Sequence, residues 1–182
     1  LSKAIRSDEP WRRVKPWPKV EKPVIEYLSV TEQKRLVNAC GDDFRALVQA
    51  ALLTGCRYGE LSAMTAKDYN PDAGTVYIRH AKAGKERHVF LTNEAQVFFE
   101  QQIVDKGRGD LIFRRKEGEV WKSWGMSHQR RRMMEACERA KIDRPIRFHD
   151  LRHTYASRLA TQGVPLAMIA EQLGHSDTRI TE

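Results

Sequence analysis

The chain has no long apolar stretch. Hydrophobic residues make up 41% of its 182 residues, but no segment approaches the roughly 20 consecutive apolar residues of a membrane span. The first ten residues also lack the apolar core of a secretion signal. Cysteine is scarce and odd in number, with Cys40, Cys56 and Cys137 far apart, which argues against a disulfide framework. We therefore exclude membrane insertion and expect one folded domain in a reduced cytoplasm.

Acidic residues are the minority among the charged ones. There are 24 Asp and Glu against 32 Lys and Arg, which gives a formal net charge of +8 at pH 7. An excess of this sign favours a polyanionic partner, and nucleic acid is the first candidate.

Residues 1–23 form a separate, basic segment. Three of the seven prolines fall between residues 16 and 23, and proline fixes φ and removes a hydrogen-bond donor, so this segment is predicted to be an extended arm or interdomain linker. Cations interleaved with two tryptophans suit contact with a nucleic-acid backbone, while a solvated terminus is an equal alternative. The candidate DNA-binding residues of the arm are Arg12, Arg13 and Lys15.

The rest of the chain, residues 24–182, has mainly helical periodicity. One β-hairpin interrupts it, with strands over 75–80 and 86–91. No alternation of strands and helices supports a doubly wound sheet, so the predicted fold is α+β, mainly helical with a small antiparallel β-sheet. Helices are expected over 31–38, 44–53, 58–63, 93–104, 127–140, 149–161 and 165–173.

Polar residues cluster at the ends of these elements, where functional sites are usually built. His149 and Arg152 are three positions apart, so on a helix they project from one face. Arg57 follows a predicted helix, and Glu60 is close enough in sequence to hold its guanidinium group. Two fixed arginines suit an oxyanion with several oxygens, such as a phosphodiester. The alternative is structural ion pairing of the arginines with Glu60 and Asp150.

Four short motifs follow one another along the chain, and together they are more specific than any one alone. They are GCRYGEL at 55–61, AKAGKERHV at 81–89, HDLRHTYAS at 149–157 and LGHSD at 173–177. In this order they resemble the catalytic domain of tyrosine site-specific recombinases, the phage integrase family. The resemblance spans about Ser29 to Glu182.

The resemblance implies a transesterification that needs no metal and no cofactor. A tyrosine attacks the scissile phosphate of double-stranded DNA, and a 3′-phosphotyrosyl link forms. Arg57 and Arg152 would bind the nonbridging oxygens, and Lys82 would protonate the leaving oxygen. His149 would act as general acid and base, and His175 would donate to the phosphate. The resemblance also implies a tetramer that works on two DNA sites. It further implies a bacterial or phage protein of the cytoplasm, associated with the nucleoid.

Other cations near these motifs have less specific roles. Lys85 competes with Lys82 for the role of the hairpin lysine, although Lys82 matches the family position better. Arg87 and His88 are expected to face DNA or solvent. A basic run at the start of the helix over 127–140 is also expected to face DNA, and a solvated surface is its alternative. The run consists of Arg130, Arg131 and Arg132.

The family's nucleophilic tyrosine would fall near position 184, past the last printed residue. The printed residues are therefore expected to be a catalytic-domain fragment able to bind DNA but not to cleave it. Within the chain, Tyr155 and Tyr58 are expected to pack rather than react. Cys56 is likewise expected to be a small core residue.

Three other functions compete with this interpretation. His149 and His153 are four positions apart and could both reach one zinc ion, but Arg152 between them would place a cation against the metal. A DNA-binding regulator or decayed integrase without a nucleophile is the second alternative. The third is a type IB topoisomerase, which shares the chemistry but does not join two DNA sites.

Overall fold

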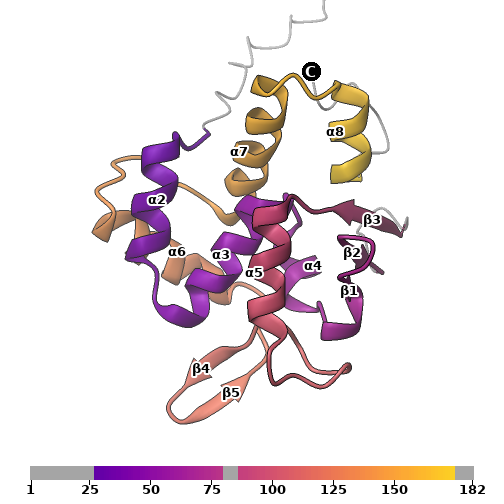
Figure 1. Cartoon of the computed structure of the whole chain (residues 1–182). Coiled ribbons are helices and arrows are strands. Elements are labelled where there is room, and N and C mark those ends of the chain that lie inside the picture. Colours follow the sequence, from indigo (N-terminus) through magenta and orange to yellow (C-terminus); the bar gives the residue numbers. More distant parts are fainter. Residues whose placement is uncertain (1–26, 80–85, 175–182) are drawn as a thin grey trace, which may run out of the picture.

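We describe a computed structural model of the chain, in which residues 27–79 and 86–174 are defined (Figure 1). The helices are α2 (Val30–Ala39), α3 (Asp42–Thr54), α4 (Tyr58–Ser62), α5 (Asn93–Ile103), α6 (His128–Arg139), α7 (Phe148–Thr161) and α8 (Leu166–Leu173), with a 3-10 turn η1 (Ala66–Asp68). The strands are β1 (Tyr69–Asn70), β2 (Thr75–Ile78), β3 (Arg87–Phe90), β4 (Arg115–Glu117) and β5 (Val120–Lys122). The predicted fold class, α+β and mainly helical, is confirmed.

Helix α3 forms the centre of the domain. Its sequence, FRALVQAALL within residues 44–53, is largely apolar, and most of its side chains are buried because other elements cover the helix on several sides. Helices α2, α4, α5 and α7 pack against it. Phe44 begins the aromatic part of this core, with its ring centroid 5.7 Å from that of Trp124 and 6.4 Å from that of Phe148.

Helix ends follow local signals in the sequence. Helix α2 begins at Val30, one residue before the expected start at position 31, because Ser29 is its cap and forms a reciprocal capping box with Glu32. Helix α3 ends at Gly55, which adopts the left-handed conformation at φ +66°. A Cβ atom there would lie 2.5 Å from Cδ1 of Tyr155 and 2.7 Å from Cδ2 of Leu173. Glycine therefore allows both the turn and the close approach of α7 and α8.

The predicted hairpin is present and belongs to a larger sheet. Strands β2 and β3 are antiparallel, with Val76 opposite Val89, and the short β1 extends the sheet on the β2 side. A second antiparallel pair, β4 and β5, was not expected. Its local signal was Gly118, which lies at φ +60° between the two strands. The β content expected from the sequence was therefore too low by this hairpin and by β1.

Candidate active site

Arg57 lies at the junction of α3 and α4, immediately beyond the end of the most buried helix. Its backbone N–H donates to Oε2 of Glu60 over 2.8 Å, and its Nη1 donates to Oε1 over 3.0 Å. This is the contact expected from the sequence. The Glu60 side chain is only 2% exposed, whereas that of Arg57 is 25% exposed, so the carboxylate anchors the arginine while part of the guanidinium group stays accessible.

Arg87 corrects an expectation from the sequence. It does not face DNA or solvent, because its side chain is 8% exposed and forms a fork-to-fork pair with Glu60, with nitrogen–oxygen distances of 3.0 and 2.9 Å. Its Nε also donates to the backbone oxygen of Gln172 over 2.9 Å. The physical reason is that a buried carboxylate requires compensation, and one partly exposed arginine does not supply enough. His88, the next residue, is exposed.

Arg152 is buried in the first turns of α7, between the ends of two other helices. Its Nη1 donates to the backbone oxygen of Gly55 over 2.9 Å, and its Nη2 donates to that of Leu173 at the end of α8. The alternative pairing with Asp150 is not observed. Asp150 instead accepts the backbone N–H of Arg147 over 2.7 Å at the start of α7. Arg152 is therefore oriented by backbone carbonyls and not neutralised by the neighbouring acid.

One cavity of about 490 Å³ brings three predicted catalytic residues together. Arg57 reaches it from the α3–α4 junction, and His149 and Arg152 reach it from α7. Arg130 at the start of α6 lines the same cavity. The floor of the site is apolar, because Phe148 and Met133 lie behind the charged groups. A polar ligand in this cavity would meet several fixed cations in a partly desolvated setting.

Burial and the nearby positive charges shift the pKa values of His149 and Arg152 in the cavity. Burial lowers the pKa of His149 below its usual 6.5, and the nearby His153, Arg152 and Arg57 lower it further. Its imidazole is therefore neutral at pH 7. Burial and the charge of Arg57 also lower the pKa of Arg152 to about 10, which leaves it charged. The site thus combines fixed positive charge with a neutral group that can accept or donate a proton.

The three arginines predicted to face DNA from α6 do not share one environment. Arg130 lines the cavity with the catalytic candidates. Arg132 points elsewhere, with Nη1 2.6 Å from Oδ1 of Asp43 and its guanidinium carbon 5.1 Å from the centroid of the Trp124 ring. Arg131 is largely exposed and donates to Glu135 over 2.7 Å. Consecutive residues on a helix point about 100° apart, so the three arginines of the run cannot all line the candidate active site.

Two further polar residues line the cavity and were not among the site residues predicted from the sequence. Arg147 lies two residues before His149, and its side chain is 83% exposed. Gln129 lies next to Arg130 on α6. The position of Arg147 at a helix start, beside the HDLR motif, was a signal that could have identified it.

Several predicted site residues lie outside the described part of the chain. They are Lys82, Lys85, His175 and the arm residues Arg12, Arg13 and Lys15.

Of the residues predicted to pack, Tyr155 and Cys56 are buried, and the half-buried Tyr58 packs against the core. Tyr155 is 4% exposed and belongs to the small apolar cluster between α7 and α8. The hydroxyl of Tyr58 donates to the backbone oxygen of Gly125 over 2.7 Å. Burial raises the pKa of the Cys56 thiol to about 11, so it is not a thiolate at neutral pH.

The imidazoles of His149 and His153 are adjacent, with ring centroids 4.9 Å apart. Two ligands do not complete a protein zinc site, which uses at least three. In the part of the chain that is described, no group of three His, Cys, Asp or Glu residues could hold a metal ion. No helix in the same part is long and apolar enough to cross a membrane.

The known proteins to which the chain is similar include tyrosine recombinases and a phage integrase. The chain is 28% identical to the tyrosine recombinase XerA of Saccharolobus solfataricus, over 98% of this chain and 59% of the relative. The structure superposes on that of a XerA recombinase with a TM-score of 0.72 and 26% identity, covering 86% of this chain and 58% of the other. For the catalytic domain of bacteriophage HP1 integrase the TM-score is 0.65 at 26% identity, and the shares covered are 85% and 83%. The chain spans less than two thirds of the first curated relatives that it matches.

A family model extends this similarity over most of the chain. The model of the phage integrase family matches residues 26–182, which include Arg57, His149 and Arg152 of the cavity. This range agrees with the extent expected from the four motifs. The fold, the cavity and the match together lead to one conclusion: the chain belongs to the phage integrase family.

Proposed function

We propose that residues 24–182 are the catalytic domain of a site-specific tyrosine recombinase, which cuts and rejoins double-stranded DNA. The observation that supports this most directly is that Arg57, His149 and Arg152 line one cavity. Two arginines fixed by other groups can receive the charge that develops on the nonbridging oxygens of a phosphodiester under attack. A pure binding module would not need a neutral imidazole beside them.

The proposed reaction exchanges one phosphodiester bond for another. The oxygen of a tyrosine, expected near position 184, bonds to phosphorus while the bond to the 5′ oxygen breaks. Arg57 and Arg152 bind the nonbridging oxygens, and His149 takes the proton of the tyrosine. Lys82 gives a proton to the leaving 5′ oxygen, and His175 donates to the phosphate. The reverse reaction on another strand completes the exchange, so no energy source is required.

The remaining parts of the proposal concern the whole protein. Residues 1–23 would be a basic arm or linker to a further DNA-binding domain, with Arg12, Arg13 and Lys15 on DNA. The partners would be duplex DNA and other recombinase protomers, in a tetramer on two sites. The protein would act on DNA in the bacterial cytoplasm, at the nucleoid.

An inactive DNA-binding regulator and a type IB topoisomerase are the alternatives. The regulator would bind DNA through the same basic surface but form no covalent link. The topoisomerase would form the link and relax supercoils without joining two sites.

The test uses the full natural chain and a duplex selected for binding from a randomised pool. A nicked version of that duplex should trap a covalent protein–DNA adduct that resists detergent. Arg57→Ala and Arg152→Ala should reduce adduct formation at least about 100-fold, as expected for loss of one oxyanion donor. Normal adduct formation in both variants would contradict the site assignment. Binding without any adduct would favour the regulator, and relaxation without strand exchange would favour the topoisomerase.

A further inference from the structure

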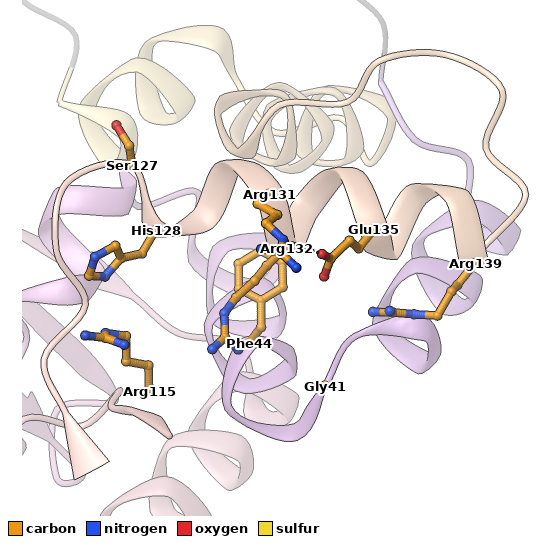
Figure 2. Close-up of a pocket in the computed structure, with 9 residues that line it drawn as sticks. All are labelled: Gly41, Phe44, Arg115, Ser127, His128, Arg131, Arg132, Glu135 and Arg139. Atoms are coloured by element: carbon orange, nitrogen blue, oxygen red, sulfur yellow. Dashed lines mark hydrogen bonds and ion pairs between the residues drawn. The ribbon is translucent and has the colours of Figure 1, made fainter. Parts of the chain in front are cut away.

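A second basic pocket lies on the other side of α6 from the candidate active site. It encloses about 560 Å³ between the start of α3, β4 and α6. Figure 2 shows the side chains of Arg115 and His128 at one end and Arg139 at the other, with Arg131 and Arg132 between them. Arg130 lines the catalytic cavity, whereas Arg131 lines this pocket.

The two exposed arginines of this pocket are oriented but have bonding capacity left. The Nε atom of Arg139 donates to the backbone oxygen of Ala39 over 2.9 Å, and the Nε atom of Arg131 donates to Glu135 over 2.7 Å. Within the described residues, the terminal nitrogens of both arginines make no hydrogen bond to protein. Arg139 also forms no ion pair with a described residue. Such terminal nitrogens match the spacing of phosphate oxygens.

His128 adds a neutral donor to the same pocket. The backbone N–H of Gly125 donates to Nδ1 of His128 over 2.9 Å. Because Nδ1 accepts this hydrogen bond, the proton of the neutral ring is on Nε2. The ring lies beside Arg115, whose own Nε is bound to the backbone oxygen of Ser123. Nε2–H is thus available for an anionic ligand.

The acidic groups near the pocket offset only part of its charge. Asp43 is buried behind Arg132 and also accepts the backbone N–H of Lys116. Glu117 pairs with Arg115, and Glu135 pairs with Arg131. Arg139 forms no ion pair with a described residue, although its charge contributes to the lowered pKa of Glu135. The pocket also lacks an open aromatic face, because Phe44 is buried and Arg132 covers Trp124. This composition suits a phosphate group and not a stacked base.

We propose that this pocket is a second phosphate-binding site, which takes a backbone phosphate of duplex DNA away from the cleavage point. The inference rests on the proposed function of the catalytic cavity. An α-helix with its side chains is about 10–12 Å wide, and the major groove is about 12 Å wide. Phosphates on the two edges of a groove occupied by α6 would therefore lie on its two sides. One edge meets the catalytic cavity, and the other meets Arg131 and Arg139.

The experiment measures duplex affinity by fluorescence anisotropy as a function of salt. Arg131→Gln and Arg139→Gln should each weaken binding about 3- to 10-fold and lower the slope of log affinity against log salt by about 1. Arg108→Gln is the matched control, because Arg108 is an exposed arginine on a loop outside both pockets, and it should change affinity less than twofold. The midpoint of thermal unfolding of each variant shows whether the fold is retained.

A site-specific readout complements the affinities. The ¹⁵N resonance of Nε2 of His128 should shift on addition of duplex in the wild type, and the shift should be smaller in Arg139→Gln. If Arg131→Gln and Arg139→Gln behave like Arg108→Gln, the second site is wrong although the protein binds DNA. A shift with inorganic phosphate but not with duplex would also overturn it, because the ligand would then be a free anion. Failure of the proposed function is distinguishable, because it would appear in the wild type as absence of the covalent adduct or of strand exchange, whereas failure of the second site would appear as equal affinities of the two variants and Arg108→Gln.

Discussion

Glu60 and Arg87 form a two-point ion pair in the interior, with nitrogen–oxygen distances of 3.0 and 2.9 Å. The same carboxylate holds Arg57, so one acid orients an arginine of the cavity and an arginine of the sheet. Arg87 also bonds to the backbone of Gln172 near the end of α8. This pair therefore connects α4, β3 and α8 behind the candidate active site.

Loss of Arg87 should destabilise the protein strongly. In Arg87→Ala the buried carboxylate of Glu60 loses two hydrogen bonds, and breaking a buried pair of this kind costs about 3–5 kcal/mol. Urea unfolding should show this loss, while Arg108→Ala at an exposed position should change the free energy of unfolding by less than about 0.5 kcal/mol. Equal stabilities of the two variants would mean that the ion pair of Glu60 and Arg87 contributes nothing to the free energy of unfolding.

Gly55→Ala should be more harmful than Gly163→Ala. Both glycines have positive φ, +66° and +81°, but a Cβ at position 163 meets nothing within 4 Å, whereas one at 55 meets Tyr155 and Leu173. We expect the free energy of unfolding to fall by about 1 kcal/mol in Gly163→Ala and by about 2–4 kcal/mol in Gly55→Ala, where overpacking is added to backbone strain. Thermal unfolding monitored by circular dichroism measures both, and identical losses would contradict the packing described for α7 and α8.

The cysteines should resist alkylation in the folded protein. Burial raises the pKa of Cys56 to about 11 and that of Cys40 to about 12, and it also raises the pKa of Cys137. At pH 8 the reactive thiolate is therefore rare, and access is restricted. Iodoacetamide followed by mass spectrometry should label no cysteine in buffer and all three in urea. Rapid labelling of Cys56 in buffer would contradict its burial.

His149 should titrate below pH 6.5 in the free protein. Burial lowers its pKa first, and the charges of His153, Arg152 and Arg57 follow. Because the folded state binds this proton more weakly than the unfolded state, the contribution of His149 to stability falls as the pH drops below 6.5. An NMR titration gives the pKa directly, and Arg57→Gln should raise it by removing a nearby positive charge. An unchanged pKa of His149 in that variant would mean that the charge of Arg57 has no measurable effect on it.

The sequence alone determined the positions of most helices and the contacts between residues that are close in the chain. Helix positions followed from periodicity and stop signals, as with Gly55 at the end of α3. The contact of Arg57 with Glu60 followed from their three-residue spacing at a helix start, and the common orientation of His149 and Arg152 followed from the same spacing on α7. The order of the four motifs indicated the family that the comparisons show.

Only the tertiary structure decided which distant charges meet. Arg87 pairs with Glu60, 27 positions away, and Arg132 pairs with Asp43, 89 positions away. No local pattern contains these pairs, because each depends on which carboxylate the folded chain buries and which arginine can reach it. The division of the α6 arginines between two pockets has the same origin. The sequence predicted a basic run, and the packing of α6 against α2 and α7 placed Arg130 in the candidate active site and Arg131 and Arg132 in the second pocket.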